Sequence, residues 1–274
     1  MKAPDFDYLR PGTLDAAISL LADAGGDAMA LAGGQSLLAM MNFRVASPSA
    51  LIDLVDLVEL RGIRREADTL RIGAMTRYAE LADSADVKAT LPLFGMAIPH
   101  IAHDAIRNRG TLGGSIALGD PAAEMPALAL ALSAAIEVVG PDGSRRIAAD
   151  DFYLGSYETA LAPDELIVAV HYPVARPDQR FGFYELAQRH GDYAMTGTAI
   201  VQTGRAYRIA FFGVADRPLR VTALEHALAE NPDPAAAQHL LSEIDFSGDV
   251  KASPATRQRL TAVALTRALQ GMTP

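Results

Sequence analysis

The fold of this chain is decided by two glycine-rich stretches, Ala32-Gly33-Gly34-Gln35-Ser36 and Thr111-Leu112-Gly113-Gly114-Ser115. Each contains a glycine pair that is followed within two residues by a serine. Because glycine has no Cβ, a ligand can come directly against the main chain, where backbone N–H groups can point at anionic oxygens. The serine hydroxyls add further donors. We therefore interpret the two stretches as the two halves of one phosphate-binding site.

The residues around the first stretch support this interpretation. Residues 28–32 form a short apolar run that leads into the glycine pair, and residues 36–41 have the pattern of a short helix. The predicted order is strand, glycine turn and helix, which is an arrangement that suits a pyrophosphate. The spacing Gly-x-Gly-x-x-Gly is missing, so the stretch is not a Rossmann fingerprint.

Composition limits the classes of function. The chain has 274 residues, half of them apolar, and a formal net charge of −9, which argues against a nucleic-acid-binding surface. No run approaches the roughly 20 apolar residues of a membrane span. Residues 1–7 lack the apolar region of a secretory signal, so we expect a soluble, cytoplasmic protein. Cysteine is absent, and any iron–sulfur cluster must therefore sit on another subunit.

Hydrophobic periodicity predicts an α+β protein. Helices are expected from about Thr13 and over residues 36–41, 77–84, 93–104, 120–132, 221–229, 234–244 and 255–269. Strands are expected over residues 28–32, 51–54, 63–66, 69–73, 134–139, 145–148, 165–172, 181–187, 194–202 and 207–214. Asp120 before Pro121 is typical of a helix cap. The segment Pro173 to Gln179 is the predicted boundary between a first domain, residues 1–176, with lobes of about 1–56 and 57–176, and a smaller domain, residues 177–274.

Four motifs occur in an order that is typical of one family. They are Ala32-Gly33-Gly34-Gln35-Ser36, Asn108-Arg109-Gly110-Thr111-Leu112-Gly113-Gly114-Ser115, Asp120-Pro121-Ala122-Ala123-Glu124 and Gly191-Asp192-Tyr193-Ala194. With them the chain resembles, over essentially its whole length, the FAD-binding medium subunit of molybdenum hydroxylases, a family that includes the medium subunit of carbon monoxide dehydrogenase and the flavin domain of xanthine dehydrogenase. The resemblance implies a two-lobed FAD-binding domain of the vanillyl-alcohol-oxidase type, followed by a small α+β C-terminal domain.

The same resemblance implies which residues bind FAD. They are Met29, Ala30, Leu31, Ala32, Gly33, Gly34, Gln35, Ser36, Ile101, Thr111, Leu112, Gly113, Gly114, Ser115, Glu124 and Ile167. Asp120 is a further candidate, with a helix cap as the alternative reading. Tyr193 matches an aromatic residue beside the isoalloxazine ring and is the candidate catalytic residue, with ordinary core packing as its alternative. Some relatives carry a cofactor-contacting lysine in the region of Glu185, and a carboxylate cannot replace an ammonium donor.

Other functional readings of single residues are weaker. His100 and His103 have a spacing that can bind metal on a helix, but no third ligand accompanies them, so no metal site is predicted. Ser36 and Ser115 lack the Gly-x-Ser-x-Gly surroundings of a catalytic nucleophile.

The resemblance implies an electron-transfer subunit. In the family, a large subunit binds molybdopterin and a small subunit carries two 2Fe–2S clusters, while the medium subunit takes the electrons onto FAD and passes them to an external acceptor. We expect both partner subunits, assembled as a dimer of heterotrimers. Three alternatives stay open: a self-contained FAD-dependent oxidoreductase with its own organic substrate, a nucleotide-binding module that is not an enzyme, and a flavin-free scaffold.

Overall fold

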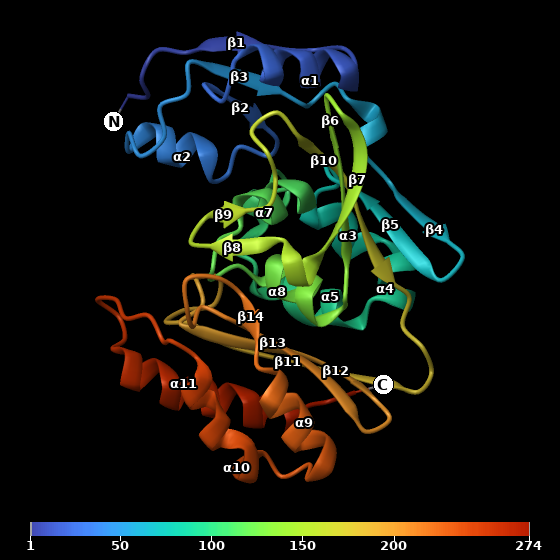
Figure 1. Cartoon of the computed structure of the whole chain (residues 1–274), viewed down its shortest axis with the longest axis vertical. Coiled ribbons are helices and arrows are strands. Elements are labelled where there is room, and N and C mark those ends of the chain that lie inside the picture. The colour runs from blue at the N-terminus through green and yellow to red at the C-terminus, as the bar shows by residue number, and fades with distance from the viewer. Residues whose placement is uncertain (1, 274) are drawn as a thin grey trace.

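The computed structural model describes residues 2–273 as a mixture of helices and strands, arranged around three sheets that follow one another along the long axis (Figure 1). The chain enters at the first sheet, crosses the second and ends at the third. Within the described residues, no helix is long and apolar enough to cross a membrane.

The first sheet is parallel and has three strands in the order β1-β3-β2. They are β1 (Asp7–Leu9), β2 (Ala28–Leu31) and β3 (Ala50–Asp53). Helix α1 (Leu14–Asp23) connects β1 to β2, buries one apolar face and begins at Thr13, whose hydroxyl accepts from the backbone N–H of Ala16. Helix α2 (Leu37–Asn42) follows the glycine turn as predicted. Strand β1 was not predicted, because three residues are too few to show a period.

The second sheet is antiparallel and has five strands in the order β4-β5-β10-β6-β7. They are β4 (Ile63–Glu66), β5 (Thr69–Gly73), β6 (Ala135–Gly140), β7 (Gly143–Ala148) and β10 (Leu166–Pro173). Both predicted hairpins are present. Strand β10 lies at the centre, and its residues 166–172 are all buried, which explains its almost continuous apolar sequence. Two short strands, β8 (Tyr153–Gly155) and β9 (Glu158–Thr159), pair beside this sheet.

Six helices lie between β5 and β6. They are α3 (Tyr78–Asp83), α4 (Ala85–Thr90), α5 (Pro92–Ala97), α6 (Asp104–Arg107), α7 (Leu112–Leu118) and α8 (Glu124–Ala131). Every residue of α8 is buried, because this helix lies between the second and the third sheet. Short 3-10 turns occur at η1 (Val58–Leu60), η2 (Ile98–His100), η3 (Ala149–Asp151) and η4 (Gln238–Glu243).

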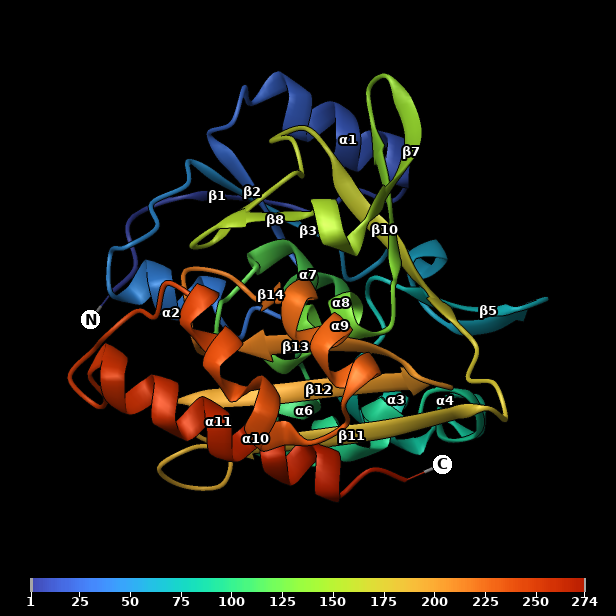
Figure 2. The same cartoon turned by 60° about the horizontal axis from the view of Figure 1, so that its bottom comes forward.

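The third sheet is antiparallel, with strands β11 (Gln179–Leu186), β12 (Thr196–Thr203), β13 (Ala206–Phe212) and β14 (Leu219–Arg220) in sequence order. Helices α9 (Thr222–Glu230), α10 (Pro234–Ala237) and α11 (Pro254–Gln270) cover one face (Figure 2). Helices α5 and α8 pack against the other face. The sheet is therefore covered on both sides.

Three predictions about helices were wrong. The single helix expected over residues 234–244 is divided into α10 and the 3-10 turn η4. The helix expected over residues 93–104 is divided into α5, η2 and α6, because Pro99 lies in the 3-10 turn η2 and Ala102 has a positive φ of 43°. The helix expected from Pro121 begins at Glu124 instead. Asp120 is not its cap, since its Oδ1 accepts from the N–H of Ala122, 2.9 Å away, within the preceding turn.

Candidate functional site

The two glycine-rich stretches lie against each other, although they are far apart in the sequence. A Cβ on Gly33 would meet the carbonyl oxygen of Arg109 and would lie 2.9 Å from the Cα of Gly110. A Cβ on Gly114 would lie 3.5 Å from the Cβ of Ala32. The close approach of the two backbones therefore depends on glycine at position 33.

The first stretch presents free backbone donors. Among the described residues, no acceptor is hydrogen-bonded to the N–H groups of residues 33–36. The turn is held by the side chain of Gln35, whose Nε2 donates to the carbonyl oxygen of Gly33 at 2.9 Å, and by Gly34, whose φ is +71°. Successive unpaired N–H groups in a turn form a concave anion-binding surface. Such N–H groups are the donors that a phosphate contact at this stretch, which the sequence predicts, would need.

The second stretch differs from that prediction, because its N–H groups are occupied. The N–H groups of residues 112–115 donate to the carbonyl oxygens of Thr76, Ala74 and Thr111 and to the hydroxyl of Thr111, over distances of 2.8–3.2 Å. A Cβ on Gly113 would lie 2.8 Å from the Cα of Ala74, so this glycine is required for packing. The pair lies in the first turn of α7 and forms a wall of the site, without supplying free backbone donors.

A cavity of ≈ 90 Å³ lies where the two stretches meet. Arg61, Arg77 and Arg109 reach it, and none of them forms an ion pair within the described part of the chain. The one carboxylate in the wall, Asp53, accepts hydrogen bonds from the hydroxyl of Tyr8 and from a backbone N–H. The cavity is lined by Leu31, Ala32, Gly33, Gly34, Leu38, Asp53, Val55, Arg61, Met75, Arg77, Arg109 and Thr111.

These features fit one segment of FAD. The cavity is smaller than the roughly 300 Å³ at which pockets for whole small molecules begin, so it could take only part of a dinucleotide. The cavity is lined by three arginines and one carboxylate, and this excess of positive charge favours binding of an anion. The unpaired N–H groups favour phosphate oxygens as their acceptors. The residues therefore fit the pyrophosphate segment of the cofactor.

The remaining predicted residues lie at different places. Met29 is 40% exposed on β2, and Ala30 follows it on the same strand. The side chains of Ile101 and Ile167 are buried in the hydrophobic core and do not line the cavity. The carbonyl oxygen of Ile101 accepts from Nη1 of Arg107 at 2.8 Å. In the structure, the side chains of these two isoleucines are therefore part of the core packing.

An acidic cluster lies beyond the end of the second stretch. Asp120 is buried, and burial raises the pKa of its carboxyl group. Burial also raises the pKa of Tyr157 to about 12. Tyr193 is 64% exposed in the loop after β11.

Glu124 and Glu185 form a buried carboxyl pair in this cluster. Each is only 9% exposed, and Oε2 of Glu185 has no hydrogen-bond partner within the described residues. Burial raises the pKa of both groups, and the negative charge of the partner raises it further for Glu185. The resemblance predicted a role for Glu124, whereas its pairing with Glu185 was not predicted.

Sequence reasoning also missed Arg61 and Arg77 as residues of the site. Arg77 reaches the cavity because its backbone forms an isolated antiparallel bridge with Thr111. No local sequence pattern predicts such a bridge. Arg109 lies within a quoted motif, but its contact with the first stretch depends on the same tertiary packing.

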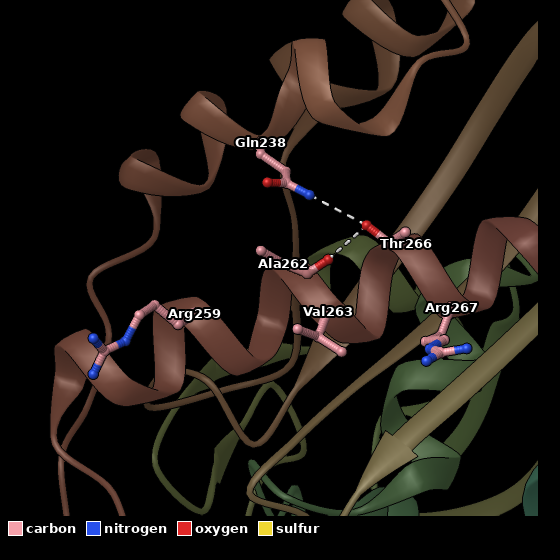
Figure 3. Close-up of a pocket in the computed structure, with 6 residues that line it drawn as sticks. All are labelled: Gln238, Arg259, Ala262, Val263, Thr266 and Arg267. Atoms are coloured by element: carbon pink, nitrogen blue, oxygen red, sulfur yellow. Dashed lines mark hydrogen bonds between the residues drawn. The ribbon is translucent and has the colours of Figure 1, made fainter.

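A larger groove, of ≈ 380 Å³, lies elsewhere on the molecule (Figure 3). It runs over the outer face of α11, where Nε2 of Gln238 donates to Oγ1 of Thr266 at 3.2 Å. In Figure 1, α11 lies at the opposite end of the molecule from β2 and α2.

His100, one of the two histidines considered for metal binding, makes an aromatic contact. Its ring stacks on that of His190 with centroids 5.4 Å apart.

Comparisons with known proteins show which families this chain is similar to. Residues 4–175 match the family model described as the FAD binding domain in molybdopterin dehydrogenase, and residues 182–272 match the CO dehydrogenase flavoprotein C-terminal domain. The chain is 42% identical to the carbon monoxide dehydrogenase medium chain of Hydrogenophaga pseudoflava, over 80% of this chain and 78% of that one. It is 34% identical to caffeine dehydrogenase subunit beta of Pseudomonas sp. strain CBB1, over 98% and 95%. A solved structure of the carbon monoxide dehydrogenase from Hydrogenophaga pseudoflava superposes with a TM-score of 0.95 at 38% identity and covers 98% of each chain.

Proposed function

Because the chain belongs to the family of FAD-binding medium subunits of molybdenum hydroxylases, we propose that it accepts electrons from an iron–sulfur partner onto FAD and passes them to an external acceptor. The observation that carries the proposal is the group of N–H donors at residues 33–36, which have no acceptor in the described part of the chain and lie next to a cavity lined by arginines. Bound FAD supplies the redox chemistry, and the protein binds and orients it.

Each part of the chain has a role in this proposal. Residues 29–36 hold the pyrophosphate and adenosine side of the cofactor, while Arg77 and Arg109 neutralise its charge. Residues 111–115 form the opposite wall. Asp120 and Glu124 contact the cofactor beyond the phosphates, and the exposed ring of Tyr193 is available to lie beside the isoalloxazine. In this proposal, Ile101 and Ile167 contribute only through packing.

The domain organisation and the partners belong to the same proposal. The boundary at residues 176 and 177 divides an FAD-binding domain from the C-terminal domain. The electrons come from 2Fe–2S clusters on a small subunit and originate at a molybdopterin-containing large subunit, within a dimer of heterotrimers. The absence of cysteine from this sequence supports that division, because the chain itself cannot ligate such clusters. A cytoplasmic location stays a prediction from the sequence.

The test is purification of the native complex, followed by its visible spectrum and by analysis of flavin, iron and molybdenum. We expect one FAD for each copy of this chain and co-purification with two other chains. A chain that purifies without flavin would overturn the proposal. A chain that purifies alone and is reduced directly by an organic compound would instead support the self-contained oxidoreductase.

A further inference from the structure

Arg257 is a buried cation whose guanidinium joins three segments of the chain. It lies at the start of α11 and is only 5% exposed. Its Nη1 donates to the carbonyl oxygen of Met195, 2.9 Å away, and to that of Gly213. Its Nη2 pairs with Oδ2 of Asp249 at 2.9 Å. A buried charge is costly unless it is paired and hydrogen-bonded, so these contacts hold the side chain in one place.

The carbonyl oxygen of Met195 belongs to the loop that carries Tyr193. This loop connects β11 to β12, and the N–H of Met195 closes it by donating to the carbonyl oxygen of Leu186 at 2.8 Å. Earlier in the loop, Gly191 has a φ of +85°, and a Cβ there would lie 2.6 Å from the carbonyl oxygen of Ala102. The loop is therefore packed closely at Gly191 and bound to α11 at Met195.

The second carbonyl oxygen connects Arg257 to the turn that precedes α8. Gly213 follows β13, and its N–H donates to the carbonyl oxygen of Pro121 at 2.7 Å. A Cβ on Gly213 would also lie 2.8 Å from the carbonyl oxygen of Ala194, the residue after Tyr193. The guanidinium therefore joins the loop to a backbone position that is itself held by Pro121.

The ring of Tyr193 depends on the backbone of this loop for its position. It is 64% exposed, so packing against the core does not fix it. Arg257 is not among the residues that line the cavity between the two glycine-rich stretches. Its contacts therefore act on the loop and not on the phosphate-binding surface.

We propose that Arg257 is a positioning residue, which fixes the backbone after Tyr193 and thereby holds the ring of Tyr193 in one place beside the flavin. The effect on the flavin rests on the proposed function, in which Tyr193 lies beside the isoalloxazine. Arginine suits this role because its planar guanidinium presents several donors in a fixed geometry, so it serves both carbonyl oxygens and Asp249 together. A lysine at this position keeps the charge but loses that geometry.

The first measurement follows the loop without the cofactor. Hydrogen exchange is measured for residues 187–195 of the full, flavin-free chain, in which the N–H groups of Asp192 and Met195 are hydrogen-bonded. Exchange in Arg257→Met should be about tenfold faster than in the native chain, the order expected when a hydrogen bond to a charged group is lost. Arg257→Lys should give an intermediate rate. Exchange at the native rate in folded Arg257→Met overturns the proposal.

Arg208→Met is the matched control. Arg208 also donates to a backbone carbonyl oxygen, that of Leu130 at 2.7 Å, and pairs with Asp150, but neither partner belongs to the loop. This variant should lower the stability of the fold and leave exchange in residues 187–195 unchanged. An equal acceleration in both variants would mean a general loosening of the fold and would overturn the specific role of Arg257.

Asp249→Asn covers a failure of Arg257→Met to fold. Asp249 is exposed, and its substitution removes the charge that holds Nη2 of Arg257 while leaving Nη1 to the two carbonyl oxygens. Exchange in the loop should accelerate, but less than in Arg257→Met. A native rate in this variant and in Arg257→Lys overturns the proposal.

The second measurement is the fluorescence of FAD bound to the full chain. A tyrosine ring against an isoalloxazine quenches its emission by electron donation, whereas phenylalanine does not, so Tyr193→Phe should increase the emission. Arg257→Met should retain FAD and increase the emission as well. It should add nothing further in the Tyr193→Phe background, because residues that act through one another are not additive. A full additional increase in that background overturns the proposal.

The two measurements separate this proposal from the proposed function. A native chain that binds no FAD, but whose loop exchanges faster in Arg257→Met, overturns the proposed function and supports the fixing of the loop. A chain that binds FAD and is brighter in Tyr193→Phe, but not in Arg257→Met, overturns the role of Arg257 alone.

Discussion

Gly33 packs directly on Gly110: a Cβ at position 33 would lie only 2.9 Å from the Cα of Gly110 and would also meet the neighbouring carbonyl oxygen of Arg109. Since all of these neighbours are backbone atoms, no side chain can turn aside to make room. The two glycine-rich stretches meet at this point, and the arginine-lined cavity lies beside it.

Gly33→Ala should therefore separate the two stretches. We expect a loss of stability of about 1–3 kcal/mol, which is typical of forced overpacking, and a large loss of bound FAD. Thermal unfolding and the flavin-to-protein absorbance ratio measure the two effects. Gly95→Ala is the control, because a Cβ there would meet nothing within 4 Å, and it should keep a normal flavin content.

Gly114→Glu should prevent FAD loading. A side chain at this position begins 2.9 Å from Oγ1 of Thr111 and 3.5 Å from the Cβ of Ala32, and it brings a negative charge toward the phosphate-binding surface. Gly114→Gln has the same shape without the charge and should keep more flavin. Equal flavin content in the native chain and in the glutamate variant would remove Gly114 from the site.

Arg77→Gln and Arg109→Gln should each weaken FAD binding, because both arginines line the cavity without an internal ion-pair partner in the described structure. We expect a cost of about 1.5–3 kcal/mol for each charged hydrogen bond lost, and a weaker dependence of Kd on salt. Fluorescence titration at two ionic strengths measures both. Arg65→Gln, an exposed substitution on β4, should leave the two values unchanged.

The Glu124–Glu185 pair should make folding stability depend on pH. Burial raises the pKa of Glu124 to about 7 and that of Glu185 to about 8, from the ordinary 4.5, so the folded chain binds protons at these groups more tightly than the unfolded chain does. The stabilisation is therefore complete below about pH 4.5 and is lost as the pH rises through about 8. Urea unfolding of the native chain and Glu185→Gln isolates this contribution. If the difference between their unfolding free energies stays constant over that range, the pair has no such effect.

Tyr193→Phe should retain FAD but change the reactivity of the flavin, because phenylalanine keeps the exposed ring and removes only the hydroxyl. Flavin content and the rate of photoreduction or reoxidation measure the two properties. Loss of all flavin from this variant would indicate that the hydroxyl has a structural role.

Features that depend on residues close together in the chain can be predicted from the amino-acid sequence alone. The hairpin around Gly143 follows from Pro141-Asp142-Gly143, where the glycine takes a φ of +106° that other residues disfavour. The strand and short helix on either side of Gly33 and Gly34 follow from the apolar pattern. The absence of cysteine excludes an iron–sulfur site from this chain under any fold.

How these parts act together depends on tertiary packing. The glycine pairs look alike in sequence, yet the carbonyl oxygens of Thr76 and Ala74 accept from N–H groups of the second stretch. The N–H groups of residues 33–36 have no acceptor among residues 2–273. In the sequence, Glu185 is an ordinary strand residue. Its raised pKa depends on burial and on the charge of Glu124, which is distant in the sequence. The physical reason is the same in each case: local pattern fixes backbone conformation, whereas hydrogen-bond occupancy and pKa depend on which distant groups the folded chain brings within a few ångströms.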